Sequence, residues 1–275
     1  MKAALLQICS SDDPAENLDT LSGLMDSAAM QGADFVLTPE VSNCVSLDRA
    51  HQAAVLCLEA DDPVLAGLRQ KARDLAVWLS IGSLALKGGA GGRFVNRSFM
   101  ISPKGEITAR YDKIHMFDVQ VSQTETYRES DGYEPGDTAV LVPTPLGCFG
   151  LSVCYDLRFP HLYRRLAQAG AEILLVPSAF SPVTGRDHWE TLLRARAIET
   201  GCFVAAAAQT GQHRARSGRA RHTYGHSMVV SPWGDVLLDA GTEPGVYTVD
   251  IQLEQVADTR KRLPSIQSER DFRGP

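Results

Sequence analysis

Two stretches with the same order of residues, "GADFVLTPE" at 32–40 and "GAEILLVPSA" at 170–179, decide the fold. In each stretch a glycine ends a helical segment, an alanine and an acid lead into a short apolar run, and a proline stops that run. Glycine commonly follows the end of a helix, and proline cannot continue the hydrogen-bonding ladder of a central strand. The repeated order predicts two similar halves, each built from layers of helix and strand.

The segments that precede these stretches begin with helix-start residues. Asp13 is followed by Pro14 and Glu16, which is typical of an N-cap, a first-turn proline and a capping-box acid. This pattern predicts a helix that runs to about Gln31. A second Asp-Pro pair at 62–63 predicts a second helix with the same kind of start.

Two longer stretches carry tight-turn residues between apolar runs. They are "FVNRSFMISPKGEITARY" at 94–111 and "YGHSMVVSPWGDVLLDA" at 224–240, each with a Pro-x-Gly turn. Such turns join antiparallel strands, so we expect mixed pairing within the sheets. An α/β sandwich with helices outside and sheets inside fits this order better than an all-parallel barrel. With no low-complexity linker, we expect one domain over 1–275.

Composition limits the classes of protein that fit. The chain has 275 residues, 44% of them hydrophobic and 22% charged, as in many globular proteins. Its longest apolar runs fall well short of the roughly 18 residues that suggest a membrane span, and its start resembles a first strand more than a signal peptide. We therefore expect a cytoplasmic protein without a membrane partner. A net charge of −6 argues against a nucleic-acid partner overall.

Six cysteines lie at 9, 44, 57, 148, 154 and 202, with no Cys-x-x-Cys pair and no regular Cys/His spacing. Neither a disulfide framework nor a zinc site is indicated. Cys154 differs from the others because it ends an apolar run in "LSVCYDLRFP" at 151–160. A thiol at a strand-to-loop turn can project into a pocket, but position alone favours an inert buried cysteine over a nucleophile.

A cysteine nucleophile needs a base or a cationic neighbour, because an ordinary thiol is mostly protonated at neutral pH. Two other predicted strand ends offer such groups. Glu40 follows "FVLTP", and Lys113 follows the strand in "ITARYDKIH". Taken singly, Glu40 is more often a solvated loop acid and Lys113 a surface lysine. No histidine lies at a comparable strand end beside an orienting acid.

Taken together, three ordered motifs carry a specific resemblance. "LTPEVS", "YDKIHMFD" and "LSVCYDLRFP" resemble the Glu, Lys and Cys motifs of the nitrilase superfamily, the carbon–nitrogen hydrolases. The resemblance extends from "KAALLQ" near the N-terminus to "RLPSIQSERDF" near the C-terminus. It implies a four-layer αββα sandwich in which Glu40 is the general base, Lys113 the oxyanion stabiliser and Cys154 the nucleophile. No metal and no organic cofactor is implied, since these groups supply the base, the nucleophile and the electrostatic stabilisation.

Three further residues are candidates for supporting roles. Glu129, in "TYRESDGYEPGD", matches a second glutamate that many family members place beside the lysine, although a solvated loop acid is an equally good interpretation. Tyr155 offers a backbone N–H for the oxyanion. Arg158 is a candidate for binding a substrate carboxylate, with a structural ion pair to Asp156 as the slightly favoured alternative.

Later segments narrow the expected reaction. "HWETLLRARAIET" and "YGHSMVVSPWGD" are similar to the amidase branch of the family. This likeness implies hydrolysis of a short amide that bears carboxylates, through a thioester and with release of ammonia. Deaminated glutathione is the first expected substrate and 2-oxoglutaramate, as for an ω-amidase, the second. Nitrilases tend to have Trp and Glu after the cysteine, whereas Tyr155 and Asp156 follow here.

Other functions stay open at this point. They are hydrolysis of a nitrile or of an N-carbamoyl amino acid and, from a different class, a binding protein without turnover. The family resemblance also suggests a homodimer or a higher homo-oligomer.

One basic segment, "HRARSGRARH" at 213–222, contrasts with the acidic chain. Its arginines are Arg214, Arg216, Arg219 and Arg221. A solvated loop is the simpler interpretation. The alternative is a loop that overhangs the pocket and attracts an anionic substrate. Nucleic-acid binding is not favoured, because no aromatic residues alternate with these arginines.

Overall fold

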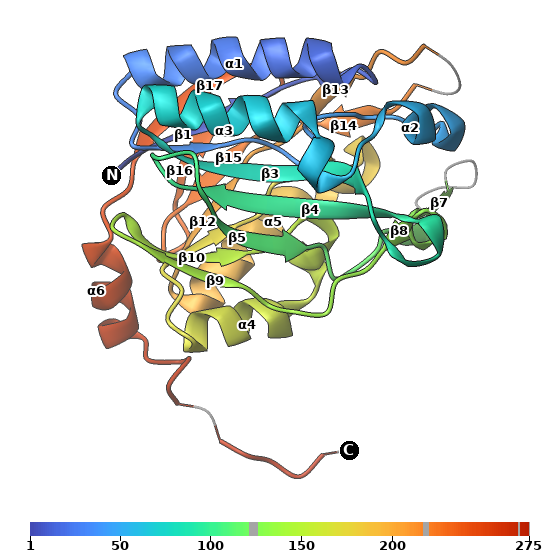
Figure 1. Ribbon diagram of the computed structural model, residues 1–275. Helices are drawn as coiled ribbons and strands as arrows, with labels where there is room; N and C mark the ends of the chain where they lie inside the picture. The colour runs from blue at the N-terminus through green and yellow to red at the C-terminus, as the bar shows by residue number, and fades with distance from the viewer. Residues whose placement is uncertain (121–125, 217–219, 269, 275) are drawn as a thin grey trace.

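The computed structural model describes residues 1–120, 126–216, 220–268 and 270–274, and its helices and sheets form four layers (Figure 1). Helices α1 (Pro14–Met30) and α3 (Pro63–Leu75) cover the first sheet. Helices α4 (Pro160–Gln168) and α5 (Pro182–Thr200) lie on the opposite side, beyond the second sheet. This arrangement confirms the predicted αββα sandwich.

The first sheet has the strand order β17-β1-β2-β3-β4-β5, with β8 paired to β4. Its three central strands β1, β2 and β3 are parallel, and β17 and β4 flank them in antiparallel pairing. The strands are β1 (Lys2–Gln7), β2 (Phe35–Leu37), β3 (Trp78–Lys87), β4 (Phe94–Ile101), β5 (Ile107–Asp112), β8 (Tyr133–Glu134) and β17 (Gly245–Asp250).

The second sheet repeats this plan in the order β16-β15-β12-β11-β10-β9. Strands β10, β11 and β12 are parallel, and β9 and β15 flank them in antiparallel pairing. Two similar halves, predicted from the repeated glycine-to-proline order, are therefore confirmed. The strands are β9 (Leu141–Thr144), β10 (Gly147–Leu151), β11 (Ile173–Leu175), β12 (Phe203–Ala206), β15 (Met228–Val230) and β16 (Val236–Asp239).

Both predicted Asp-Pro helix starts are confirmed. The Asp13 side chain accepts a hydrogen bond from Ala15 N at 3.0 Å, and Asp62 accepts one from Leu65 N at 2.7 Å. The predicted capping box at Glu16 is wrong. The Ser11 hydroxyl already accepts the Asp13 N–H at 3.1 Å, and the Glu16 carboxylate turns outward to accept hydrogen bonds from Ser11 and Arg214.

Apolar side chains fill the spaces between the layers. Phe35 of β2 and Phe149 of β10 stack across the two sheets with ring centroids 4.8 Å apart. Leu21 and Met25 of α1 are completely buried in a second cluster, between α1, α3 and the outer face of the first sheet. Because each sheet is covered on both faces, the central strands are continuous apolar runs rather than alternating ones.

Shorter elements gather at one end of the sandwich, on the right in Figure 1, where α2, β7, β8 and β14 lie. They include α2 (Arg49–Val55), the antiparallel pairs β6 (Asp118–Gln120) with β7 (Thr126–Arg128) and β13 (Thr210–Gln212) with β14 (His222–Tyr224), and the 3₁₀ helices at Glu59–Asp61, Ala90–Gly92, Glu129–Asp131 and Cys154–Arg158. Helix α6 (Glu254–Arg262) lies at the opposite edge. Within the described ranges, no helix is long and apolar enough to cross a membrane.

Candidate active site

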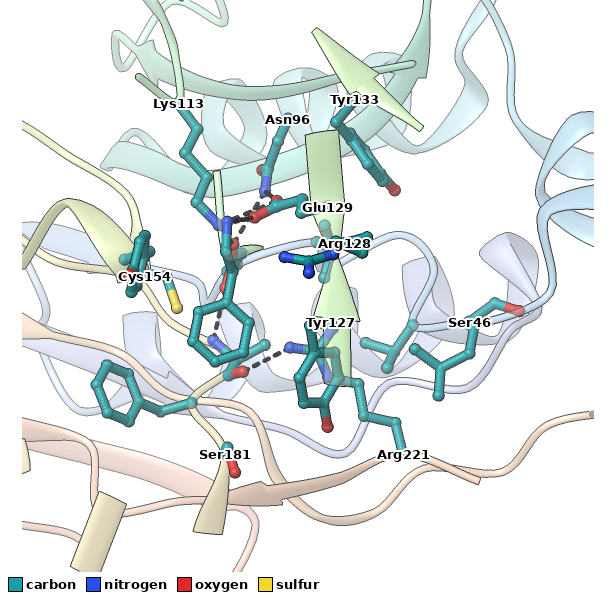
Figure 2. Close-up of a pocket in the computed structure, with 18 of the residues that line it drawn as sticks. Ser46, Asn96, Lys113, Tyr127, Arg128, Glu129, Tyr133, Cys154, Ser181 and Arg221 are labelled. Atoms are coloured by element: carbon teal, nitrogen blue, oxygen red, sulfur yellow. Dashed lines mark hydrogen bonds and ion pairs between the residues drawn. The ribbon is translucent and has the colours of Figure 1, made fainter. Parts of the chain in front are cut away.

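Three loops bring Glu40, Lys113 and Cys154 into one cavity of about 290 Å³ (Figure 2). Glu40 lies just beyond the end of β2, Lys113 directly follows β5, and Cys154 lies just beyond the end of β10. Strands β2 and β10 belong to the central parallel sets of the two sheets, so their carboxyl ends supply one group from each half. The structure thus brings together the three residues that carried the sequence resemblance.

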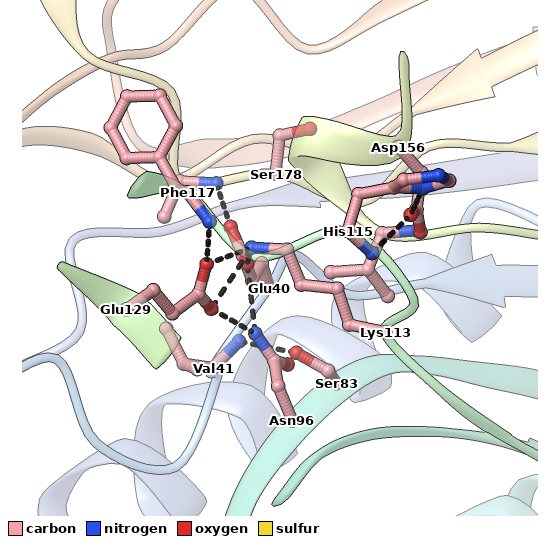
Figure 3. A network of polar contacts seen from close by, with 12 residues as sticks. Glu40, Val41, Ser83, Asn96, Lys113, His115, Phe117, Glu129, Asp156 and Ser178 are labelled. Carbon is pink, nitrogen blue, oxygen red and sulfur yellow. Dashed lines mark hydrogen bonds and ion pairs between the residues drawn. The ribbon is translucent and has the colours of Figure 1, made fainter. Parts of the chain in front are cut away.

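The Glu40 carboxylate is buried, with 3% of the residue exposed, and accepts hydrogen bonds on both oxygens (Figure 3). Its Oε1 lies 2.9 Å from Lys113 Nζ and 2.9 Å from Asn96 Nδ2. Its Oε2 lies 2.8 Å from the backbone N of Ala179, in the loop after β11. The Cys154 thiol also contacts this carboxylate. These donors hold Glu40 beside the thiol in a fixed orientation.

Lys113 lies between two carboxylates. Its Nζ contacts Glu40 and also lies 3.0 and 2.8 Å from the two oxygens of Glu129. Glu129 is itself held by Phe117 N, at 2.7 Å from its Oε2. Glu129 is therefore not a solvated loop acid: it contacts the lysine, as the family resemblance implied.

Burial and charge set the protonation states of the three groups. Burial raises the pKa of Glu40, but Lys113 and Arg221 lower it more, so this pKa lies below its usual value. Burial lowers the pKa of Lys113, yet Glu129 and Glu40 hold it well above its usual value. Burial and then the Glu40 charge raise the pKa of the Cys154 thiol above its usual value, although Lys113 opposes them. The free site therefore contains a neutral thiol, a carboxylate and an ammonium group.

The backbone at Cys154 turns sharply. Its φ of 51° lies in the left-handed region, where residues with a Cβ are strained. Its N–H donates to Pro177 O at 3.0 Å. Among the backbone hydrogen bonds between described residues, none is donated by the N–H of Tyr155, at the start of the following 3₁₀ helix. This N–H is thus available to a ligand.

Asp156 anchors this turn to the loop that carries Lys113. It is completely buried; its Oδ1 accepts from both the backbone N and the Nδ1 of His115, and its Oδ2 accepts from Tyr111 Oη at 2.6 Å and Val153 N at 2.8 Å. Asp156 therefore pairs with His115, and the alternative of an ion pair with Arg158 is wrong. Tyr111 and His115 flank Lys113, so one carboxylate links the nucleophile turn to the lysine loop.

Arg158, a candidate for binding a substrate carboxylate, is not among the described residues that line the cavity. Its guanidinium contacts His188 at 3.2 Å and lies over the rings of Tyr155 and Phe180. Tyr155 does line the cavity.

The basic segment is divided between two roles. Arg214 pairs with Glu16, and Arg216 with Asp13, so these two arginines lie against the start of α1. Arg221 lines the cavity and donates from Nη2 to Ala179 O at 2.7 Å. Arg219 lies outside the described residues. The described arginines divide between the two predicted alternatives: Arg214 and Arg216 are largely exposed to solvent, whereas Arg221 lines the pocket.

Several groups of the site were missed at the level of sequence. Asn96 interrupts the apolar strand "FVNRSF", and this polar residue in a buried strand was an available signal. The Ala179 and Phe117 contributions are backbone N–H groups, which no residue type reveals. Arg128, in β7, also lines the cavity. The sequence gives no signal for this position, because the short β6–β7 ribbon that carries Arg128 has no apolar pattern.

A buried carboxylate, amine and thiol at adjoining strand ends of an αββα sandwich define the class of carbon–nitrogen hydrolases. The family model described as carbon-nitrogen hydrolase matches residues 2–261. The chain belongs to this family.

Among its relatives is a deaminated glutathione amidase from Synechocystis sp., 40% identical over 272 residues that cover 96% of each chain. The NitFhit protein of C. elegans has a similar structure, with a TM-score of 0.89 and 35% identity, covering 98% of this chain and 65% of that longer one. Nit3 of Saccharomyces cerevisiae, a member of branch 10 of the nitrilase superfamily, has a TM-score of 0.84 and 26% identity over 96% of this chain and 94% of that one.

Proposed function

We propose that this carbon–nitrogen hydrolase is an amidase that uses Cys154 as nucleophile, Glu40 as general base and Lys113 as oxyanion stabiliser. The observation that supports it most is the contact of one buried carboxylate, Glu40, with both the thiol and the ammonium group. A base must lie close to the proton that it removes, and Glu40 lines the same cavity as the Cys154 thiol, on whose pKa its carboxylate acts.

The first half of the reaction forms a thioester. Glu40 removes the thiol proton as Cys154 Sγ attacks the amide carbonyl carbon, and the carbonyl oxygen becomes an oxyanion that Lys113 Nζ and the Tyr155 N–H stabilise. The proton on Glu40 then passes to the leaving nitrogen as the C–N bond breaks. Since the thiol pKa is raised, a free thiolate is not stored, and proton transfer accompanies attack.

The second half restores the free protein. Glu40, again ionised, removes a proton from water, which attacks the thioester carbonyl. The same oxyanion donors stabilise the tetrahedral intermediate, and Cys154 leaves and regains a proton. Glu129 contacts Lys113 but not the thiol, so we assign it the role of positioning the ammonium group.

For the substrate, we propose deaminated glutathione, supported by the name and 40% identity of the Synechocystis relative. The leaving group depends on the amide. Every amide of deaminated glutathione is secondary, so its hydrolysis releases an amine, whereas ammonia leaves only from a primary amide such as 2-oxoglutaramate. An assay must therefore detect both the released amine and ammonia.

The test is turnover on a panel of deaminated glutathione, 2-oxoglutaramate, a simple nitrile and an N-carbamoyl amino acid, with Cys154→Ala as the control. We expect the highest kcat/KM on deaminated glutathione and background rates with the variant. A preference for 2-oxoglutaramate would favour an ω-amidase. Absence of turnover on the whole panel by folded protein would favour a binding role instead.

Three other expectations stay predictions: one domain over 1–275, a homodimer or higher homo-oligomer, and a cytoplasmic location. Limited proteolysis, analytical ultracentrifugation and fluorescent tagging, respectively, would test them.

A further inference from the structure

The cavity carries more positive than negative side chains. Its ionisable lining consists of the carboxylates of Glu40 and Glu129 and the cations of Arg49, Lys113, Arg128 and Arg221, besides the thiols of Cys44 and Cys154 and the tyrosine hydroxyls. Lys113 is already paired with both carboxylates. The excess positive charge therefore comes from the arginines.

Arg221 is the best placed of these arginines to meet a ligand. Its Nη2 is fixed on Ala179 O at 2.7 Å, and its guanidinium lies 5.9 Å from the centre of the Tyr127 ring. Within the described residues it makes no ion pair, although its charge lowers the pKa of Glu40. One hydrogen bond leaves most of the five guanidinium N–H donors available, in a planar fork that suits a carboxylate.

A hydroxyl group lies on the same wall. Thr184, in the first turn of α5, lines the cavity, and its buried Oγ1 has no hydrogen-bond partner among the described residues. The loop that joins β11 to α5 connects Thr184 to Ala179, the residue that holds Arg221. An unpaired buried hydroxyl costs stability unless a ligand pairs with it.

Arg128 adds a second cation to this cavity. It belongs to β7, next to Tyr127, whose ring Arg221 overlies, and Figure 2 shows both guanidinium groups among the lining side chains. Arg128 makes no ion pair within the described residues, although the Asp118 carboxylate, opposite it on β6, interacts with it electrostatically. Arg49 differs, because it bonds Gln52 and lies over the ring of Tyr133.

We infer that Arg221, Arg128 and the Thr184 hydroxyl form a carboxylate-binding subsite that selects amides with a carboxylate remote from the scissile bond. This inference rests on the proposed amidase function and deepens it, because it assigns the substrate's anionic group to named side chains. The subsite is distinct from Arg158, the carboxylate-binding candidate named from the sequence, which is not among the described residues that line the cavity.

The experiment compares deaminated glutathione with its dimethyl ester, which keeps the amides but removes both carboxylate charges. We measure kcat/KM for each substrate in the wild type, in Arg221→Gln and in Arg128→Gln. Arg216→Gln is the matched control, from the same basic segment but paired with Asp13. The wild type and the control should prefer the acid by about 10- to 100-fold, as expected for a charge-assisted hydrogen bond.

Each of the two test variants should reduce this preference to a few-fold, chiefly through KM for the acid. The ratio between the substrates separates carboxylate recognition from any effect of Arg221 on Glu40, which both substrates share. An unchanged ratio in both variants would overturn the subsite.

A binding measurement separates failure of the subsite from failure of the proposed function. Calorimetric titration with glutarate, a dicarboxylate without an amide, does not need turnover. We expect the Kd to rise about tenfold or more in Arg221→Gln and Arg128→Gln and to stay unchanged in Arg216→Gln. If the wild type cleaves neither substrate but glutarate follows this pattern, the function fails and the subsite stands. Equal Kd values in all variants, or no binding to the wild type, overturn the subsite.

Discussion

The loops after β2 and β11 occupy corresponding positions in the two halves, yet they contribute different chemistry. In both, a proline stops the strand, at Pro39 and at Pro177. The first loop then places the Glu40 carboxylate in the cavity, whereas the second offers the backbone N–H of Ala179, which donates to Glu40 at 2.8 Å. The repeated scaffold thus sets the positions of the two loops. A difference of one or two residues decides that the first loop carries the acid and that the second loop fixes its orientation.

Strands β1 and β10, each one helix earlier in the chain, also occupy corresponding positions, and the residues that follow them also differ in chemistry. Cys154 lies three residues after the end of β10, and Ser10 lies three residues after the end of β1. The Ser10 hydroxyl donates to Ser42 O at 3.1 Å and has no place in the cavity lining of the described chain. The thiol instead contacts Glu40. The first half supplies the base and the cation, and the second supplies the nucleophile.

The largest effect should follow from removing the acid of the first loop. Glu40→Gln keeps an oxygen that accepts from Lys113 or Asn96 but cannot take a proton, so kcat should fall by about 10² to 10⁴ with the fold retained. The matched change in the second loop, Ser178→Ala, removes a hydroxyl that bonds Val176 O, and it should leave kcat within about threefold. Steady-state kinetics and circular dichroism check both; a Glu40→Gln rate within tenfold of wild type would place the base elsewhere.

Removing the cation should have the next largest effect. Lys113→Ala should lower kcat by about 10² to 10³, the usual cost of an oxyanion donor. It should also lower the melting temperature, because Glu40 and Glu129 then face each other without the ammonium group. Adding Glu129→Gln removes one of these charges, so the double variant should regain stability but not kcat. Recovery of both would mean that Lys113 has only a structural role.

A substitution at Gly82 tests whether the loops after β2 and β11 must pack closely against each other. A Cβ there would lie 2.0 Å from Thr38 O and 2.5 Å from Pro177 Cβ, in both loops at once. Gly82→Ala should therefore cost about 1–3 kcal/mol in the free energy of unfolding and reduce kcat as Glu40 moves. Gly150→Ala is the control, since its nearest neighbours are Leu174 and Leu166 side-chain atoms at 3.0–3.2 Å. Equal losses in urea unfolding would show that loop contact does not matter.

How much of this arrangement was predictable differs between the scaffold and the site. The sandwich, its two halves and the Asp-Pro helix starts follow from local patterns, because caps, strand-stopping prolines and apolar runs act over a few residues. Glu40, Lys113 and Cys154 were predicted from ordered motifs.

The capping box at Glu16 and the Asp156–Arg158 pair were wrong because distant partners, Arg214 and His115, compete for those carboxylates. The Ala179 N–H and the inward course of Arg221 depend on loop conformation, which residue types do not encode.

The smallest predicted effect links Arg221 to the acid of the first loop. Loss of activity on acidification reports protonation of Glu40, whose pKa burial raises but Lys113 and Arg221 together lower below its usual value. The wild-type kcat/KM should therefore persist below the pH at which an ordinary glutamate is protonated. Without Arg221 the pKa of Glu40 rises, so Arg221→Gln should lose activity at a higher pH, whereas Arg216→Gln should not. The acid limb is best measured on the dimethyl ester, because its lack of charge removes the carboxylate contact from the comparison. If the acid limbs of the variants superimpose, the second half of the protein orients Glu40 through the Ala179 N–H alone, and Arg221 does not lower the pKa of Glu40.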